Sequence, residues 1–440
     1  MNGSGTNGAD TNRSGTNGGA GNGVGVSGAH ANGNAAHAGP RIDGVDLSSP
    51  APGRLLPAAA FTSPAIYDAE MREIFARSWV HVADLTELRE PGDYVTASIG
   101  TSPVVVVRGH DGVVRGFLNV CRHRGATIAE GRGNCDRQLR CPYHAWSYGT
   151  DGRLIGLPSR EEFTCDFATM NLLPIRIGIC GPMVFGCVDA EAPPFEEWIG
   201  ELGAAMTRAR GAEMELAFEY TYDVEVNWKI YVENGLEGYH VAVVHDVLND
   251  FVETKTARHW FEPHASYTHA FIKPEYRTIF PRLAALADED AYVRFGHVFP
   301  NLIPVVTPAE FSYLRIDPIG PERIRLVARS FDLGDADAVE LRDFRREALD
   351  RTNHQDIGVV TRVQRGLHAH GYAGGVHASF LEVRIHHFEE MVSRAHAGDR
   401  RGAPPRPPED GRVLMEARQR ARAATSPGAA AGDQGEGVSR

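Results

Sequence analysis

The distribution of apolar and polar residues divides the chain into a folded body and two tails. Residues 1–50 are mostly Gly, Asn, Ala, Ser and Thr, and residues 399–440 are rich in Arg, Pro, Ala and Gly. Such segments bury too little apolar surface to offset the entropy of ordering the backbone. We therefore expect two disordered tails, the second with one short helix around 413–424, and a folded body from about Leu55 to Gly398.

The first third of the folded body is predicted to be a helix followed by strands. Apolar residues recur at helical spacing in Pro64–Ser78, within an amino-terminal segment 55–78 that we expect to pack with the later part of the chain. Short Val-rich stretches separated by Gly- and Pro-containing turns then predict strands at 79–83, 94–98, 103–108 and 113–120. The segment 79–190 is accordingly predicted to be an all-β domain.

After Pro194 the pattern mixes helices and strands. Helices are predicted at 195–210, 229–244, 338–351 and 357–368 and from about Ser379, and strands at 215–226, 311–316 and 323–331. An all-β segment followed by this mixture is typical of an α+β protein with two domains, here 79–190 and 195–398.

Charge and cysteine content narrow the possible functions. The 440 residues carry 45 basic and 57 acidic side chains, so the formal net charge is −12, unlike the basic footprint of nucleic-acid-binding proteins. We find no apolar run of about 18 residues and no signal-like amino terminus, so we expect a cytoplasmic protein without a membrane span. The six cysteines all lie between Cys121 and Cys187, which favours metal ligation or buried thiols over disulfides.

Two short loops in the predicted β domain each pair one cysteine with one histidine. These are Cys121-Arg-His123 and Cys141-Pro-Tyr-His144. Thiolate and imidazole ligands suit zinc or an iron–sulfur cluster, and a structural zinc site is the main alternative. Zinc fingers, however, usually place two cysteines in one half and two histidines in the other. Two mixed loops suit a Rieske [2Fe–2S] cluster, in which two histidines replace two cysteines on one iron. The remaining cysteines are expected to be buried thiols: Cys135, Cys165, Cys180 and Cys187.

A second set of candidate ligands lies in the predicted helix 229–244. His240 and His245 are five residues apart, which places them about 140° apart on an ideal helix, so they can bind one metal only if the helix breaks between them. Glu237 precedes His240 by three residues and shares its face, where a carboxylate can hold the second nitrogen of a ligand histidine. An amphipathic helix with incidental histidines is the alternative.

Together these motifs resemble those of the Rieske non-haem iron oxygenases, the large catalytic subunits of ring-hydroxylating oxygenases and their monooxygenase relatives. The resemblance covers about residues 55–395, and Ala145 departs from it where the family often has Gly. It implies an α+β fold with an all-β Rieske domain and a catalytic domain that has a central antiparallel sheet and flanking helices. It also implies a [2Fe–2S] cluster on Cys121, His123, Cys141 and His144.

The resemblance further implies a mononuclear Fe(II) held by His240, His245 and a downstream acid, with Glu237 as a bridging carboxylate. Three acids are candidates for the third ligand: Glu347, Asp350 and Asp356. The segment His-Gln-Asp356-Ile, followed by Val363-Gln-Arg-Gly-Leu367, is similar to the family's segment around that ligand, so Asp356 is predicted. An acid at a helix amino terminus, stabilised by the helix dipole, is the alternative for Asp356.

The function implied is that of a terminal oxygenase component, which uses O2 and NAD(P)H-derived electrons to hydroxylate a small organic substrate, with an aromatic one expected first. The electrons would come from a separate reductase, and a ferredoxin and a beta subunit are further candidate partners. A homotrimer is expected, in which electrons pass from the side of His144 in one chain to Glu237 in the next. Neither nucleic acid nor membrane is expected as a partner.

Two alternatives stay open. The protein has Glu rather than Asp at position 237, and this residue and the segment 363–367 are similar to the branch of the family that acts on choline, carnitine and other quaternary amines. This alternative would make the protein a monooxygenase or N-demethylase of a quaternary amine, such as a choline, betaine or carnitine-like compound. Its cation would suit an aromatic cage, with these candidates: Phe261, Tyr267, Phe271, Phe299 and Tyr313. A Rieske electron carrier without oxygenase activity is the alternative of another class, but a carrier has no use for a second metal site.

Overall fold

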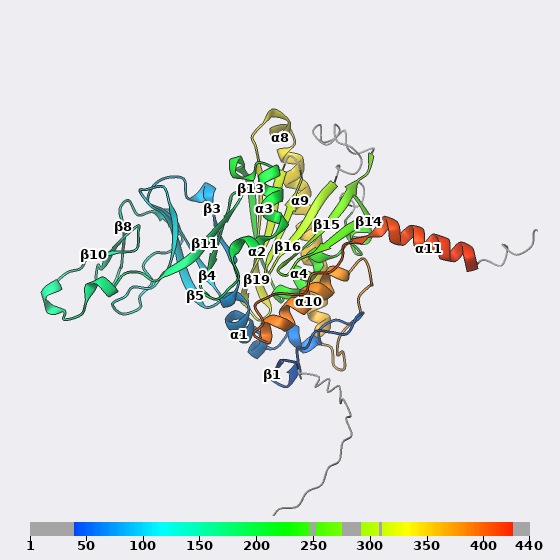
Figure 1. The fold of residues 1–440 in the computed structure, drawn as a ribbon, viewed down its shortest axis with the longest axis horizontal. Helices are drawn as coiled ribbons and strands as arrows, with labels where there is room; N and C mark the ends of the chain where they lie inside the picture. Colours follow the sequence, from blue (N-terminus) through cyan, green and yellow to red (C-terminus); the bar gives the residue numbers. More distant parts are fainter. Residues whose placement is uncertain (1–38, 246–247, 249–251, 275–291, 308–309, 426–440) are drawn as a thin grey trace, which may run out of the picture. The chain divides into compact units, whose positions relative to one another are not determined.

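The computed structural model describes residues 39–245, 248, 252–274, 292–307 and 310–425 of the chain (Figure 1). Helices and antiparallel strands are both abundant, so the fold is α+β, as predicted. Among the described residues, every helix is too short or too polar to cross a lipid bilayer. The predicted tails fall partly outside the described residues, at 1–38 and 426–440.

The amino-terminal half of the body forms two antiparallel sheets. The larger has the order β3-β12-β11-β6-β5-β4-β7 and the smaller β10-β9-β8. The four consecutive valines of β5, Val104–Val107, are all fully buried, because this strand lies inside the sheet with packed side chains on both faces. The strands are β3 (Val80–Asp84), β4 (Asp93–Ile99), β5 (Ser102–Arg108), β6 (Val114–Leu118), β7 (Arg132–Asn134), β8 (Gln138–Arg140), β9 (Ser147–Gly149), β10 (Leu154–Gly156), β11 (Pro174–Cys180) and β12 (Met183–Cys187).

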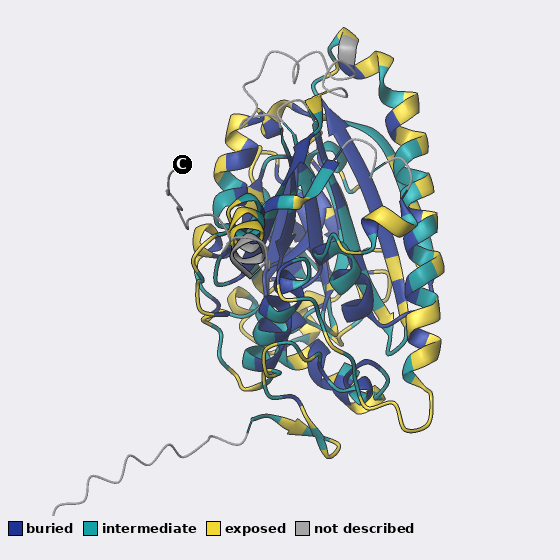
Figure 2. Ribbon diagram, turned by 90° about the vertical axis from the view of Figure 1, so that its right-hand side faces the viewer, coloured by how far each residue is buried: buried dark blue, intermediate teal, exposed yellow. Residues whose placement is uncertain are grey.

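The carboxyl-terminal half is built on one eight-stranded antiparallel sheet. Its order is β13-β19-β18-β17-β16-β15-β14-β20. The helix α4 (Trp228–Leu236) packs on β16, β17 and β18. The helices α9 (Arg342–Leu367) and α10 (Val383–His396) pack against α4. Figure 2 shows that the strands are largely buried, whereas the flanking helices expose one side. The remaining strands are β13 (Glu215–Val224), β14 (Val252–Phe261), β15 (Ala265–Ile272), β16 (Tyr292–Val298), β17 (Leu302–Val306), β18 (Glu310–Gly320) and β19 (Arg323–Asp332).

The helices differ from the predicted ones at three places. The predicted helix 195–210 divides at Gly200, which has a φ of +52°, into α2 (Phe195–Ile199) and α3 (Glu201–Arg208). The predicted helix 229–244 ends at Leu236 and resumes as α5 (Val241–Val244). The two predicted helices 338–351 and 357–368 are instead a short α8 (Ala336–Glu340) and one continuous α9 (Arg342–Leu367).

The continuity of α9 has a physical reason that hydrophobic periodicity cannot detect. The stretch 351–356 is entirely polar, which is typical of a linker. In the structure Asn353, Asp356 and Gln364 are nonetheless buried on the inner face of this helix. The Gln364 side chain, for example, accepts a hydrogen bond from the backbone N–H of Asn227 at 2.7 Å. The inner face of α9 is therefore polar because it contributes to a site.

The described part of each predicted tail contains secondary structure. At the amino end β1 (Arg41–Ile42) and β2 (Val45–Asp46) form a hairpin, and Leu47 after it is fully buried. At the carboxyl end β20 (Glu409–Asp410) pairs with β14 and leads into α11 (Gly411–Thr425). Individual contacts order this segment: Arg258 Nε donates to the Asp410 carboxylate at 2.7 Å, and the Arg412 guanidinium lies 3.8 Å from the centre of the Phe271 ring.

A buried ion pair connects the amino-terminal helix α1 (Pro64–Glu73) to α4. The Lys229 ammonium contacts the Glu70 carboxylate, and both side chains are completely buried. The indole N–H of Trp228 donates to the other Glu70 oxygen at 2.7 Å. Burial raises the pKa of Glu70, and Lys229 opposes this shift by favouring the charged form. The predicted segment 55–78 is thus joined to the helix that precedes the candidate metal ligands.

Replacing Lys229 with Met should destabilise the protein by about 3 kcal/mol, because it leaves a buried carboxylate without its cation. Chemical denaturation followed by circular dichroism would measure the loss. Adding Glu70→Gln to that variant should recover part of it, since the uncompensated charge is then removed. Lys255→Met, on the exposed side of β14, is the matched control and should change little. Equal stability of the Lys229 and Lys255 variants would contradict this account.

Candidate metal centres and substrate pocket

The two Cys/His loops adopt the same local conformation. The N–H of Gly125 donates to the carbonyl of Cys121 at 3.0 Å, and the N–H of Ala145 donates to the carbonyl of Cys141 at 3.1 Å. The fourth residue after each cysteine also has a positive φ, 76° at Gly125 and 57° at Ala145. Each loop is therefore a tight turn, and in the second turn an alanine occupies a conformation that favours glycine.

The structure brings the four candidate ligands of these loops together. The rings of His123 and His144 have their centres 4.6 Å apart, and Cys121 and Cys141 are buried free thiols that interact with each other. Trp146 stacks on His123 at 5.1 Å with the rings nearly parallel. The Nδ1 atom of His123 is buried and has no hydrogen-bond partner. A buried polar atom without a partner is uncommon, and it is what an imidazole that binds a metal requires.

The electrostatics of these loops also fit a bound metal cluster. Burial raises the pKa of the Cys121 thiol, and the neighbouring Cys141 raises it further. Burial lowers the pKa of His123, and electrostatic repulsion by the neighbouring His144 ring lowers it further, which favours the neutral form of His123. Tyr148, which sequence reasoning missed, accepts the N–H of Arg122 at 3.0 Å and lies 3.4 Å from the Cys121 sulfur. The Cys121 thiol thus stays protonated unless a cation such as iron stabilises the thiolate.

The break after α4 brings the second set of candidate ligands to one point. His240 precedes α5 and His245 follows it, and their Nε2 atoms are 3.1 Å apart. Asp356, midway along α9, places Oδ1 3.0 Å from His245 Nε2 and 3.5 Å from His240 Nε2. One atom from each of these three residues lies within 4.8 Å of the others, a grouping that can hold a metal ion. Two histidines and one carboxylate are the donor set of non-haem Fe(II) sites.

The opposite nitrogen of each histidine is held by a hydrogen-bond acceptor. Glu237 contacts Nδ1 of His240, as its position three residues earlier predicted, and Gln355 Oε1 lies 2.9 Å from Nδ1 of His245. These contacts keep a hydrogen on the Nδ1 atom of each ring, so Nε2 is the nitrogen that faces Asp356 and that a metal would bind. Gln355 was not singled out from the sequence, and its only signal was its place beside Asp356.

Asp356 and His240 are strongly coupled electrostatically. Burial alone would raise the pKa of Asp356, but hydrogen bonds from His240 and His245 outweigh it and lower that pKa. Burial alone would lower the pKa of His240, but Asp356 and Glu237 outweigh it and raise the pKa to about 9. The centre of this site is therefore a carboxylate that needs positive charge beside it.

The other acids considered for the third ligand lie elsewhere. Asp350 accepts a hydrogen bond from the Tyr222 hydroxyl at 2.6 Å, and Glu347 is exposed. The alternative for Asp356 is wrong, because Asp356 lies in the middle of α9 and not at a helix amino terminus.

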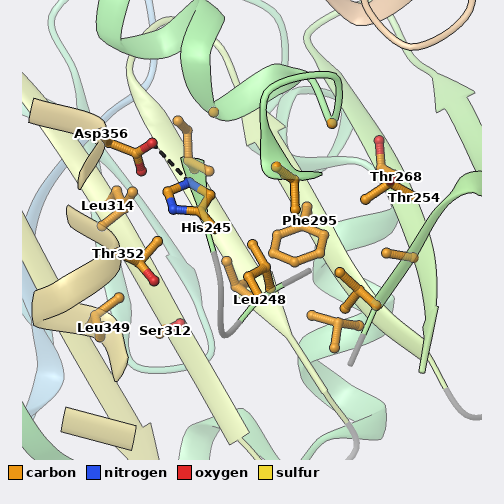
Figure 3. A pocket seen from close by; sticks show the side chains of 18 of the residues that line it. His245, Leu248, Thr254, Thr268, Phe295, Ser312, Leu314, Leu349, Thr352 and Asp356 are labelled. Carbon is orange, nitrogen blue, oxygen red and sulfur yellow. Dashed lines mark ion pairs between the residues drawn. The ribbon is translucent and has the colours of Figure 1, made fainter. Parts of the chain in front are cut away.

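A largely apolar cavity of about 290 Å³ adjoins the three residues. Figure 3 shows His245 and Asp356 facing each other at one side, with Phe295 and Leu248 farther in. Of the aromatic residues proposed for a cage, only Tyr313 lines the cavity. The other four are buried and do not line it: Phe261, Tyr267, Phe271 and Phe299. Sequence reasoning missed the aromatic residues that do line it because they come from separate strands and helices: Phe218, Phe295 and Phe344.

Comparison with known proteins agrees with both sites. Residues 78–172 match the family model of the Rieske [2Fe–2S] domain, and residues 212–398 match that of the ring hydroxylating alpha subunit (catalytic domain). The carnitine monooxygenase oxygenase subunit of Escherichia coli K12 is 30% identical over 330 residues, which cover 72% of this chain and 86% of that protein. The toluate 1,2-dioxygenase subunit alpha of Pseudomonas putida is 33% identical over 196 residues, 42% of this chain and 43% of that one.

The fold has a similar solved structure. The quaternary ammonium Rieske monooxygenase CntA, crystallised with an inhibitor, aligns with a TM-score of 0.69 at 24% identity, over 78% of this chain and 95% of that one.

Ala145→Gly should stabilise the protein by about 1 kcal/mol, because glycine adopts a positive φ without the strain of a Cβ atom. Differential scanning calorimetry would detect the shift in the unfolding transition. The reciprocal change Gly125→Ala is the matched variant. Its Cβ would meet no atom within 4 Å, so strain alone should lower stability by a similar amount. A lower unfolding temperature for Ala145→Gly would contradict this interpretation.

Proposed function

The chain belongs to the Rieske non-haem iron oxygenases, and on this premise we propose that it is a monooxygenase whose substrate is a small quaternary ammonium compound. It is a terminal oxygenase component, with a Rieske cluster and a mononuclear iron, that uses O2 and electrons supplied by a reductase. The substrate class rests on the likeness to carnitine monooxygenase and on the mostly apolar cavity, which suits the methyl groups of a quaternary amine. An aromatic substrate is the second candidate, favoured by the likeness to toluate dioxygenase.

In this proposal Cys121, His123, Cys141 and His144 hold the [2Fe–2S] cluster, and His240, His245 and Asp356 hold the mononuclear iron. Segment 79–190 is then the Rieske domain, and segment 195–398 the catalytic domain, to which the amino-terminal helix of 55–78 also belongs. The observation that carries the proposal is the convergence of two Nε2 atoms and one carboxylate oxygen on a single point of an apolar cavity. When bound, the two iron centres supply electron transfer and the activation of O2.

The chain's own residues orient these ligands and shield the substrate. Glu237 and Gln355 keep the Nδ1 hydrogens of His240 and His245 in place, so that each ring would offer the lone pair of Nε2 to a metal that replaces any Nε2 hydrogen. The apolar wall around Phe295 and Leu314 excludes water and strengthens electrostatic interactions inside the cavity. Substrate that fills the cavity is thereby placed next to Asp356 without competing solvent.

We further propose a homotrimer in which electrons cross between subunits, from His144 of one chain to Glu237 of the next. Apolar side chains exposed next to both residues support an interface there: Tyr143 is 58% exposed, Tyr239 62% and Val243 88%. Exposed apolar surface marks protein–protein contacts when it is contiguous, and these side chains lie beside the two residues that would have to meet across the interface. A ferredoxin and a beta subunit are the further candidate partners.

Replacing His240 with Ala should abolish product and lower the iron content from about three to about two atoms per chain, while the visible absorption of the cluster remains. Metal analysis, absorption spectroscopy and product assays with a reductase would measure these three quantities. His354→Ala is the matched control, an exposed histidine on α9 close to Asp356 in sequence, and should keep iron and activity. Undiminished turnover by the His240 variant would overturn the assignment of His240 as an iron ligand. Two irons per chain in the unaltered protein would indicate an electron carrier.

Mixed oligomers test the proposed route between subunits. We would co-express two differently tagged chains, one with His144→Ala and one with His240→Ala, and purify the oligomers that carry both tags. If electrons cross between chains, these oligomers should regain a measurable fraction of activity, because an intact cluster in one subunit adjoins an intact iron site in the next. Oligomers that carry two tagged copies of His240→Ala are the control. Inactive mixed oligomers would indicate transfer within one chain.

A further inference from the structure

The cavity is lined by a buried guanidinium that has no carboxylate partner among the residues that the structure describes. Arg384, on α10 (Val383–His396), is 2% exposed. Its Nε and Nη1 donate to the hydroxyl oxygens of Ser266 and Thr268, and its Nη2 donates to the carbonyl of Ser266, each at 3.0 Å. All three acceptors are neutral. Burial lowers the pKa of Arg384 to about 9, so its charge is held in the interior at a cost that no described acid offsets.

The other buried arginines of the described chain all have acidic partners. Arg294 pairs with Glu201, and Arg329 pairs with Asp84 and Glu87. Arg345 also lines the cavity, but Glu310 at 2.8 Å and Asp332 at 3.1 Å neutralise it. Because the described residues supply a carboxylate to each of these guanidinium groups and none to Arg384, a ligand carboxylate is the natural complement of Arg384.

Neighbouring groups on the same wall are arranged as further donors. Thr268 accepts from Arg384, so its own hydrogen is free to donate to Nδ1 of His259 at 2.9 Å. This arrangement puts the imidazole hydrogen of His259 on Nε2, which is buried, has no hydrogen-bond partner and belongs to a residue that lines the cavity. Burial and then Arg384 lower the pKa of His259 to about 3, so the ring is neutral. Within the described part of the chain, two guanidinium hydrogens of Arg384 and the Nε2 hydrogen of His259 remain without acceptors.

We propose that Arg384, His259 and Thr268 form a subsite that binds a carboxylate group of the substrate. Figure 3 places Thr268 and Thr254 on the side of the cavity away from His245 and Asp356, with Phe295 between them. A substrate that fills the cavity then has its carboxylate at this wall and its reacting carbon near the three proposed metal ligands. The inference rests on the proposed function and narrows it: a trimethylammonium carboxylate or an aromatic acid fits, and an amino alcohol without a carboxylate does not.

Equilibrium binding to the oxidised holoenzyme, measured by calorimetry without a reductase, separates recognition from turnover. The probes are two matched pairs: γ-butyrobetaine against butyltrimethylammonium, and benzoate against toluene. We expect the carboxylate member of at least one pair to bind about tenfold or more tightly than its partner. The pair that shows the difference identifies the substrate body. The proposal would be overturned if neither carboxylate bound more tightly than its partner without a carboxylate, or if neither carboxylate bound detectably.

Variants of the subsite assign the difference to its residues. Arg384→Gln should abolish the preference for a carboxylate, and Arg384→Lys should keep part of it. Thr268→Val retains the charge of Arg384 but removes the hydroxyl that orients its guanidinium, and should weaken carboxylate binding severalfold. This variant keeps the test decisive if Arg384→Gln does not fold. Arg394→Gln, on the same helix but paired with Asp399 and outside the cavity lining, is the matched control and should bind like the unaltered protein. A preference that survives Arg384→Gln contradicts the subsite.

The outcome distinguishes this inference from the proposed function. A carboxylate preference that depends on Arg384, together with no O2-dependent product from any probe, would leave the subsite standing and refute the monooxygenase proposal. Hydroxylation of butyltrimethylammonium as efficient as that of γ-butyrobetaine would support the monooxygenase and refute the subsite.

Discussion

The catalytic half of the molecule is organised around a buried carboxylate that must be compensated. Asp356 lies inside an apolar cavity, and such a charge is stable only with cationic or hydrogen-bonding partners at contact distance. His240 and His245 can provide them only because α4 ends at Leu236 and the chain turns before α5. The buried pair of Lys229 and Glu70 joins α4 to α1, so the amino-terminal helix and the site share one chain of contacts.

The orientation of each histidine ring also depends on a single neighbouring side chain. Glu237 accepts from the backbone N–H of His240 at 3.1 Å and also contacts the Nδ1 atom of that ring. One carboxylate thus stabilises the irregular segment after α4 and selects the tautomer of a candidate ligand. Gln355 does the second task for His245 from α9, one residue before Asp356. A shift of α9 along its axis would therefore displace the proposed ligand Asp356 together with Gln355, which orients His245.

The sequence alone predicted what depends on local spacing and missed what depends on tertiary packing. The Cys/His spacing indicated a mixed-ligand cluster, and the 140° separation of His240 and His245 required the helix break that the structure contains. Asp356 could be chosen only through a family resemblance, because nothing local distinguishes it from Asp350. Gln355, Tyr148 and Arg384 gave no usable signal, since their roles follow from contacts with residues 27 to 118 positions away. The aromatic cage was mostly wrong because composition cannot say which ring faces a cavity.

The proposed role of Arg384, a cavity guanidinium that no described acid neutralises, affects which substrates the site selects. Apolar walls hold a substrate with little directional preference. The position of the reacting carbon would therefore be set by the polar contact between the substrate carboxylate and Arg384. A guanidinium held by Ser266 and Thr268 cannot rotate to follow a misplaced ligand, and its planar donors favour one carboxylate orientation. The distance from that wall to Asp356 then selects the length of the substrate. Chain length between carboxylate and reacting carbon, more than the nature of the apolar body, would decide which compounds are hydroxylated and at which atom.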